Sequence, residues 1–264
     1  MGVDHEEVHY GVRVRNDGAV RIIVIDRPFR RNALDIEIRP VLSGLLRAAD
    51  ADRAVRAIVV TGANGTFCAG GDIKDMRRQS PDLARPRLVA AQEIVRAIAG
   101  GCTPVVAAIE GAAFGAGLGL ALACDRVIAG DSARLSAAFT RVGFAADLGM
   151  TWSLPQRVGR ARARQMLMGG DPVDAQTALA MGLVDSVVPC GEALEAALRD
   201  AARLAAGPPR ALALIKQAFA APARDLDAAL DREIEMQAEL SDTDDYAEGI
   251  AAFHQHRPPR FVGA

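Results

Sequence analysis

Two short glycine-rich segments constrain this chain more than any other feature of its sequence. Gly62–Asp72 and Gly111–Gly119 each follow a run of β-branched and small apolar residues, and each precedes a helical pattern. Glycine at such strand–helix junctions lets the backbone approach a ligand closely, because no side chain blocks the way. Two junctions of this kind can direct two backbone N–H groups at one acyl oxygen and stabilise the negative charge that develops there.

Nucleotide-binding motifs fit the same glycines less well. Gly65–Gly70 has the glycine spacing of a phosphate-binding loop, but Gly71 and Asp72 stand where that loop needs Lys followed by Ser or Thr. Gly115–Gly119 lacks the G-x-G-x-x-G spacing of dinucleotide-binding proteins. The glycines therefore favour chemistry at an acyl group over phosphate binding.

Three motifs, in this order and spacing, resemble the enoyl-CoA hydratase/isomerase (crotonase) superfamily. They are Arg27-Pro-Phe-Arg-Arg-Asn-Ala-Leu34, Phe67-Cys-Ala-Gly-Gly-Asp-Ile-Lys74 and Ala112-Ala-Phe-Gly-Ala-Gly-Leu-Gly119. The resemblance extends from about Val20 to Phe253, which is nearly the whole chain. It implies an α/β fold with a crotonase-type spiral of β-β-α units over residues 1–190, followed by a helical trimerisation block over 191–264. It also implies a homotrimer or a dimer of trimers.

The resemblance further implies where an acyl-CoA thioester binds. The oxyanion donors would be the backbone N–H groups of Ala69 and Ala116, and CoA would enter as part of the substrate without a metal or other cofactor. The substrate-binding set from the same motifs is Arg30, Ala69, Gly70, Gly71, Asp72, Ile73, Lys74, Gly115, Ala116 and Phe139. Arg30, Arg31 and Lys74 are candidates for the CoA phosphates, and Asp72 is expected to cap a short helix over Ile73–Arg78.

The acid and base residues separate two possible activities. Hydratases of this superfamily place two glutamates where this chain has Gly119 and Phe139. Neither residue can transfer a proton, and hydration needs groups to activate water and to handle the α-proton. Asp147 remains nearby, in a segment similar to that of ring-1,2-epoxyphenylacetyl-CoA isomerases. The resemblance therefore implies a double-bond isomerase with Asp147 as its base, and enoyl-CoA hydratase is the alternative.

Asp147 has a second interpretation, in which its side chain only caps the helix beginning at Leu148 or Gly149. In the catalytic interpretation its apolar neighbours, such as Phe144 and Leu148, should desolvate the carboxylate and raise its pKa. The four histidines lie near the chain ends, at His5, His9, His254 and His256. No central imidazole base is therefore evident.

Composition narrows the remaining classes of protein. The 264 residues carry a net charge of −2, which argues against bulk affinity for nucleic acid. A trimeric RNA-binding relative of the fold stays open only through Arg199, Arg203 and Arg210. The four cysteines show no metal spacing; Cys102 and Cys124 are expected to be buried, and Cys68 to serve packing. The acidic N-terminus and the lack of a long apolar stretch favour a cytoplasmic protein without a membrane span.

The pattern of apolar residues predicts the order of elements. A hairpin is expected around Asn16-Asp17-Gly18. The predicted strands are Ala57–Thr61, Val105–Ile109, Asp125–Ala129 and Ala133–Ser136. The predicted helices are Leu34–Ala51, Ile73–Arg78, Asp82–Ala99, Gly117–Cys124, Arg160–Met168, Gly191–Ala206, Pro209–Ala220, Leu226–Leu240 and Asp244–His254.

Overall fold

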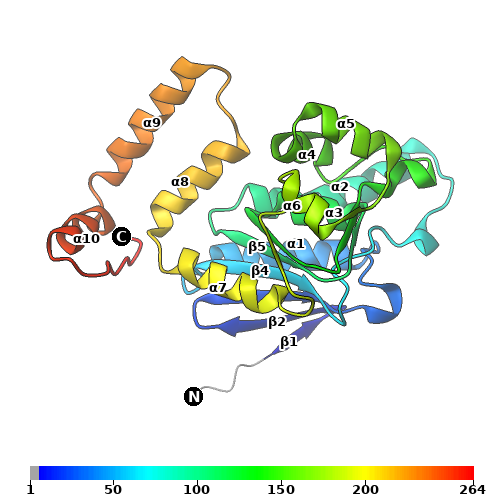
Figure 1. Ribbon diagram of the computed structural model, residues 1–264, viewed down its shortest axis with the longest axis horizontal. Coiled ribbons are helices and arrows are strands. Elements are labelled where there is room, and N and C mark those ends of the chain that lie inside the picture. The colour runs from blue at the N-terminus through cyan, green and yellow to red at the C-terminus, as the bar shows by residue number, and fades with distance from the viewer. Residues whose placement is uncertain (1–5) are drawn as a thin grey trace.

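A mainly parallel sheet of seven strands runs through the computed structural model, which describes residues 6–264 (Figure 1). The strand order is β1-β2-β3-β4-β5-β7-β10. The bounds are β1 (Glu7–His9), β2 (Val12–Asp17), β3 (Val20–Ile25), β4 (Ala57–Gly62), β5 (Val105–Ile109), β7 (Arg126–Gly130) and β10 (Ser186–Val188). His5 and the rest of the first five residues lie outside the described part of the chain, so their predicted roles stay predictions.

The first three strands form an antiparallel meander, and the others join in parallel. Asp17 pairs with Val20 across a tight turn in which Gly18 has φ +56°, as expected for the predicted hairpin. From β3 onward each strand pairs in parallel with the next strand of the order. Parallel strands need covering on both faces, and β4 and β5 are buried along almost their whole length.

Helices cover both faces of this sheet, and alternate side chains of one strand pack against the helices on opposite faces. Ile58 and Val60 of β4 join the core under α1 (Ile38–Ala51) and α2 (Pro81–Ala99). Ala57 and Val59 face the opposite way and pack with the buried alanines of α7 (Ala193–Ala205). This alternation follows from the two-residue period of a strand and produces the predicted α/β architecture.

A smaller sheet and four helices form the upper right of the molecule in Figure 1. The strands are β6 (Ala112–Phe114), β8 (Arg134–Ser136) and β9 (Val173–Asp174). The helices are α3 (Ala116–Ala123), α4 (Met150–Val158), α5 (Arg160–Gly169) and α6 (Ala175–Ala180). Residues 6–264 also contain three turns of 3-10 helix: η1 (Pro28–Arg30), η2 (Ile73–Asp75) and η3 (Ala138–Val142).

The last three helices stand away from the sheets as an arm (Figure 1). They are α8 (Pro209–Ala220), α9 (Leu226–Leu240) and α10 (Asp244–His254), with the bounds predicted from sequence. We call residues 207–264 the C-terminal arm. Although α7 lies within the 191–264 helical block expected from sequence, it packs on the main sheet and the arm begins after it.

Polar contacts fasten the arm to the sheet. The buried Lys216 ammonium forms an ion pair with Asp125 at 2.9 Å and donates to the Thr103 carbonyl at 2.7 Å. Arg56 donates to the Gly207 carbonyl at 2.8 Å and to the Phe261 carbonyl at 3.2 Å.

Within residues 6–264 no helix combines the length and the apolar character that crossing a bilayer requires.

Three local predictions differ from the structure. The helix expected from Leu34 begins at Ile38, because Leu34 forms a bridge with Gly71 and Asp35 accepts from Ile38 N–H at 2.9 Å. The helix expected over Ile73–Arg78 ends at Asp75; its polar continuation buries no side chain that would stabilise further turns. Cys102 is exposed in the turn after α2, whereas Cys68 and Cys124 are buried.

Candidate active site

The two glycine-rich segments lie against each other through their backbones. Cys68 N–H donates to the Ala112 carbonyl at 2.9 Å, and Phe114 N–H donates to the Cys68 carbonyl at 3.0 Å. A Cβ on Gly117 would lie 2.2 Å from the Cys68 carbonyl oxygen, so no other residue fits there without a shift. The glycines therefore serve the close approach that their pattern predicts.

Asn32 holds the first motif in place. Its side chain is fully buried, its φ of +57° lies in the left-handed region, and its amide donates to the Ala63 and Thr66 carbonyls at 2.9 and 2.5 Å. Asn is one of the few residues besides glycine that accept this conformation readily. The asparagine in the first motif thereby joins the loop before α1 to the loop after β4.

Ala116 presents one free backbone donor. It is the first residue of α3, where an N–H has no partner within the helix, and no acceptor for it lies in the described part of the chain. A Cβ built on Gly70 would lie 3.6 Å from the Ala116 nitrogen, so the two segments converge here. The positive end of α3 adds to the attraction for a developing oxyanion.

The partner donor predicted from sequence is wrong. Ala69 N–H already donates to the Arg31 carbonyl at 3.0 Å, so it cannot also hold a thioester oxygen. Leu34 bonds to the residues on either side of Gly71, through Leu34 N–H to Gly70 O at 2.8 Å and Asp72 N–H to Leu34 O at 3.4 Å. In a parallel bridge this pattern turns the N–H of Gly71 away from Leu34. Gly71, already in the predicted substrate-binding set, therefore has an N–H directed away from Leu34, with no acceptor for it among the described residues.

The residues predicted to surround CoA gather at Asp72. Its carboxylate accepts from Lys74 N–H at 3.0 Å, which is the predicted cap, and lies 3.5 Å from the Arg30 guanidinium. Ile73 is 65% exposed, and the Lys74 and Arg30 side chains lie at the surface. This exposed rim beside Gly70 and Gly71 has the positive charge that a phosphate would need.

Asp147 occupies a polar position inside an apolar wall. Its Oδ1 atom is buried without a hydrogen-bond partner among residues 6–264, and desolvation raises the pKa of the carboxyl, as predicted, against the opposing charge of Arg39. The helix-capping interpretation is wrong: α4 starts after Gly149, with no side-chain cap, and Asp147 supplies only a carbonyl to Met150 N–H at 3.1 Å. A buried carboxylate oxygen without a partner costs stability, so this atom is a candidate for a functional role.

The backbone after Asp147 is strained. Leu148 has φ +49°, which costs an L residue with a branched side chain about 1–2 kcal/mol. Its Cβ lies 2.8 Å from the position that a Cβ on Gly119 would occupy. The strained turn therefore packs Leu148, the residue after Asp147, against Gly119 of α3.

The two positions of the hydratase glutamates are filled by other groups. A glutamate at Gly119 would collide with Leu148, so the absence of a side chain there is a packing requirement of this chain. Phe139 is buried, and its ring lies 3.9 Å from the Cβ position of Gly115. The site thus has an aromatic wall and packed backbone where a hydratase has two carboxylates.

Sequence reasoning missed Arg39 on α1. Its guanidinium lies 3.8 Å from the Cβ position of Gly71, and its charge opposes the rise in the pKa of the Asp147 carboxyl. The signal was present in the sequence, since Arg39 borders the apolar stripe of Ile38 and Leu42. A cation at that border can reach inward as easily as outward.

Two other carboxylates bond to backbone N–H groups and are structural. Glu110 accepts from Gly191 and Ala193 N–H at 2.9 and 3.0 Å, and Asp125 accepts from Val105 N–H at 2.7 Å. Residues 6–264 contain no group of three or more His, Cys, Asp and Glu side chains that could hold a metal ion.

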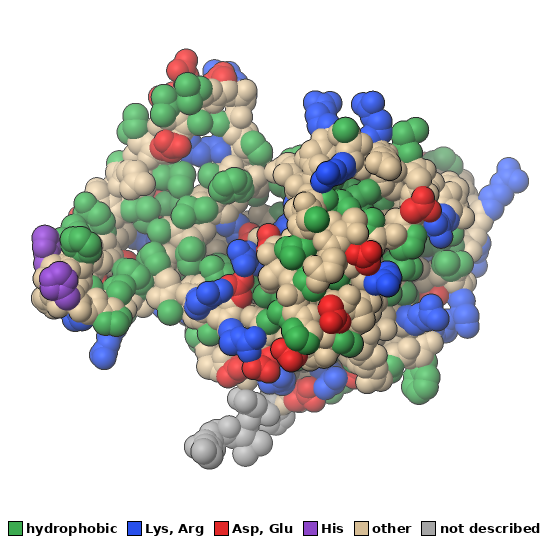
Figure 2. All heavy atoms as spheres, in the orientation of Figure 1, with side chains coloured by type: hydrophobic (Ala, Val, Ile, Leu, Met, Phe, Trp, Pro, Cys, Tyr) green, Lys and Arg blue, Asp and Glu red, His purple; other side chains and the backbone are tan. Residues whose placement is uncertain are grey.

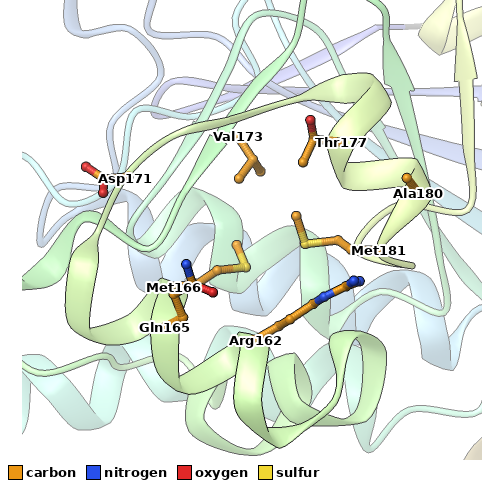
Figure 3. Close-up of a pocket in the computed structure, with 8 residues that line it drawn as sticks. All are labelled: Arg162, Gln165, Met166, Asp171, Val173, Thr177, Ala180 and Met181. Atoms are coloured by element: carbon orange, nitrogen blue, oxygen red, sulfur yellow. The ribbon is translucent and has the colours of Figure 1, made fainter.

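A separate hollow lies between α5 and α6 and contains none of the predicted site residues. Its volume is about 360 Å³, and the side chains of Met166 and Met181 point into it (Figure 3). Its lining is Arg162, Gln165, Met166, Asp171, Val173, Thr177, Ala180 and Met181.

Comparison with known proteins agrees with this geometry. Residues 15–264 match the Enoyl-CoA hydratase/isomerase family. A probable enoyl-CoA hydratase of Rhodobacter capsulatus is 39% identical over 256 residues, which cover 97% of this chain and 99% of that protein. The 1,2-epoxyphenylacetyl-CoA isomerase of Escherichia coli is 37% identical over 250 residues, which cover 92% of this chain and 95% of that protein.

A solved structure shows the same fold. The putative enoyl-CoA hydratase of Streptomyces coelicolor superimposes with a TM-score of 0.92 at 36% identity, covering 100% of this chain and 98% of that one. The chain therefore belongs to the enoyl-CoA hydratase/isomerase family, and its α/β architecture is the crotonase fold that the motifs predicted.

Proposed function

We propose that this protein is an acyl-CoA double-bond isomerase. The observation that supports this most is Asp147, a half-buried carboxylate whose Oδ1 atom is enclosed without a partner among the described residues, while the two hydratase positions are Gly119 and Phe139. One carboxylate suffices to remove a proton and return it, whereas hydration needs a second group for water. The named isomerase among the relatives is consistent with this activity.

In the proposed reaction the thioester oxygen accepts from Gly71 and Ala116 N–H. Asp147 removes an α- or γ-proton, and the electrons of the broken C–H bond pass into the conjugated thioester to give a dienolate. The two donors stabilise its oxyanion. Asp147 then returns the proton at the other carbon, so the double bond moves and no atom is gained or lost. Arg30 and Lys74 would bind CoA phosphates, and the chemistry needs no metal or redox cofactor.

The hydratase alternative is distinguished by an assay. A panel of acyl-CoAs differing in chain length, ring content and double-bond position would be monitored for hydration and for double-bond shift in deuterated solvent. We expect a double-bond shift with α- or γ-deuterium incorporation, and slow or no hydration of crotonyl-CoA. Hydration at about 10 per second or faster, an ordinary enzymatic rate, would show that the missing glutamates do not matter.

Ion pairing disfavours the RNA-binding alternative. Arg199 pairs with Glu195 and Arg203 with Asp200, and Arg210 lies 3.1 Å from Glu239. Each of the three arginines that suggested a basic face is thus matched by a carboxylate. Nucleic-acid binding gains its affinity from unmatched positive charge.

The proposed assembly is a homotrimer or a dimer of trimers that forms through the C-terminal arm. Large apolar side chains are exposed along all three arm helices, among them Phe219 (72%), Ile234 (63%) and Phe253 (78%). Figure 2 shows hydrophobic side chains distributed over the visible face of the arm. A monomer rarely leaves so much apolar surface in water.

A further inference from the structure

The hollow between α5 and α6 has a mainly apolar lining and lies apart from the residues of the candidate active site. Met166 and Met181 point into it, and Val173 and Ala180 add to its apolar lining (Figure 3). Methionine side chains are flexible and polarizable, so they adapt to the shape of an incoming apolar group. Met168, near the end of α5, is 72% exposed. This part of the core therefore presents apolar groups to its surroundings.

Unpaired arginines stand beside the hollow. Arg160, Arg162 and Arg164 of α5 are all exposed, and Arg162 lines the hollow itself. Within residues 6–264 none of the three forms an ion pair, and the one carboxylate in the lining, Asp171, is already paired with Arg141 at 2.8 Å. Figure 2 shows basic side chains over the upper right of the molecule, where Figure 1 places α5. The surface is thus apolar at its centre and positive at its edge.

Helix α9 of the C-terminal arm carries an apolar stripe without a partner. Leu226, Leu230 and Ile234 are spaced four residues apart, so they lie on one face of the helix, and they are 72%, 47% and 63% exposed. No residue of α9 is buried, and the main contact of this helix is with α8. The stripe is therefore available to another surface.

Unpaired acids border this stripe. By the helical period, Asp227 and Asp231 lie along one side of it and Glu233 along the other, whereas Glu235 projects from the far side of the helix. In the described part of the chain none of these four carboxylates forms an ion pair. The face is apolar at its centre and negative at its edges, which complements the charge beside the hollow.

One chain cannot bring these two surfaces together. In Figure 1 α9 lies at the far left, and α5 and α6 lie on the other side of the molecule. The buried ion pair of Lys216 with Asp125, and the bonds from Arg56 to Gly207 and Phe261, hold the start and the end of the arm on the sheet. A second copy of the chain is the occupant that supplies such a helix.

We propose that the hollow between α5 and α6 receives helix α9 of a second copy of this chain. Leu230 and Ile234 would be its apolar anchors, with the arginines of α5 against the carboxylates of α9. An amphipathic helix with anchors one turn apart in an apolar groove is a common mode of recognition. Because the two surfaces differ, the contact is head-to-tail, and such contacts close into rings when the rotation between copies allows it. The inference rests on the homotrimer of the proposed function and adds the surface that accepts the arm.

Charge reversal tests the contact from both sides. The acceptor variant carries Arg162→Glu and Arg164→Glu, and the donor variant carries Asp227→Arg and Asp231→Arg. Each should raise the concentration at which the oligomer dissociates by at least about tenfold, because like charges then face each other across the interface. Combining all four changes in one chain restores opposite charges and should recover most of the loss, which is the mark of a direct contact. Sedimentation velocity over a dilution series gives the dissociation.

Matched reversals elsewhere are the controls. Arg85→Glu on α2 changes another exposed arginine, and Glu235→Arg changes the far side of α9. Both should leave the dissociation unchanged. Losses that add in the combined variant, or the absence of a loss in both the acceptor and the donor variant, would overturn the proposal.

Cross-linking tests the contact by proximity. With the exposed Cys102 and Cys190 changed to Ser, a chain carrying Leu230→Cys and Ala180→Cys would be treated with a short bismaleimide. Because α9 and α6 of one chain lie far apart, the links should join different chains and give covalent dimers and trimers. Glu235→Cys with Ala180→Cys should give few links. An oligomer that yields no more links with Leu230→Cys than with Glu235→Cys would contradict the proposal.

These measurements separate the failure of this inference from that of the proposed assembly. A wild-type monomer would remove both. An oligomer that Ile234→Asp dissociates and the acceptor variant does not would keep the arm as the element of assembly and reject the hollow as its receiver. Free reaction of Ala180→Cys with a soluble thiol reagent in the intact oligomer would also overturn the proposal, since the hollow would then be open to a small molecule instead.

Discussion

Asp147 of the crotonase core and two carboxylates of the C-terminal arm, Asp245 and Glu248, differ in how their oxygens are satisfied. In the arm, Asp245 accepts from Val262 N–H at 2.6 Å and from Gly263 N–H at 3.0 Å, and Glu248 receives two bonds from Arg257 at 2.6 and 2.8 Å. In the core, Asp147 keeps one buried oxygen without any partner. The pKa of Glu248 is lowered to about 2 by Arg257, whereas desolvation raises that of Asp147.

The two regions also differ in how they use apolar side chains. The core buries them between sheet and helices, while α9 has no buried residue at all. The satisfied carboxylates of the arm stabilise its own fold, and its exposed apolar faces suit contact with another protein surface. An unsatisfied carboxylate beside free N–H groups describes a region built to act on a ligand. Variants in the two regions test whether the core carries the chemistry and the arm carries the assembly.

The largest effect is expected from Asp147→Asn. The change keeps the size of the side chain and removes its ability to accept a proton, so the isomerisation rate should fall by roughly two to four powers of ten. The melting temperature should hold or rise, because a desolvated charge disappears. The matched control, Glu248→Gln in the arm, should spare the rate per site. Near-normal proton exchange in the Asn variant would remove Asp147 from the mechanism.

Ala116→Val should produce the next largest loss. A branched side chain at the start of α3 crowds the oxygen site, and loss of one such donor costs about a hundred- to a thousandfold in rate. Ala116→Gly leaves the backbone donor and should be mild. Steady-state kinetics on the true substrate checks both. An intact rate in the Val variant would mean that the thioester oxygen is bound elsewhere.

Assembly should depend on the arm. Replacing Ile234 and Phe253 by Asp places charges on the exposed apolar faces of α9 and α10, and we expect the trimer or hexamer to dissociate. Light scattering measures the mass, and Glu235→Gln, an exposed polar change on α9, is the control. A wild-type protein that is already an active monomer at micromolar concentration would contradict the prediction.

The attachment of the arm gives a smaller effect on stability. Lys216→Met removes the buried ammonium that bonds to Asp125 and Thr103, and the free energy of unfolding should fall by about 1–3 kcal/mol. Arg210→Met removes an exposed ion pair with Glu239 and should cost under about 1 kcal/mol. Chemical denaturation compares the two, and equal costs would mean that Lys216 does not anchor the arm.

The smallest effect concerns the tail after α10 in acid. Because the folded pKa of Glu248 is lowered to about 2 from 4.5, its contribution is complete above the unfolded value and is lost as pH falls toward about 2. NMR signals of residues 257–264 should therefore keep their folded positions at moderately acidic pH. Release of this tail near the ordinary carboxyl pKa would show that Arg257 does not hold Glu248.

The sequence predicted most elements and the meeting of the two glycine-rich segments, because glycine patterns and apolar periods are local signals. Two features depended on contacts that are distant in sequence. The choice of Gly71 over Ala69 as donor follows from the bridge with Leu34, which also shortens α1. The inward reach of Arg39 depends on α2, whose packing no local pattern specifies. Most helices and the motifs could be predicted; the start of α1 and the direction of one N–H and one guanidinium could not.

The order of strands in the main sheet has a consequence for how the protein is made. Neighbours in the sheet are successive strands of the chain up to β5, and the arm comes last. A chain that leaves the ribosome from its N-terminus meets each partner strand already formed. We therefore expect pulse-labelled hydrogen exchange during refolding to protect β3–β5 before α9. The arm, with its exposed apolar side chains, would then emerge only after the core that precedes it in the chain. This order limits the time in which a nascent chain exposes both an open sheet edge and a surface for self-association.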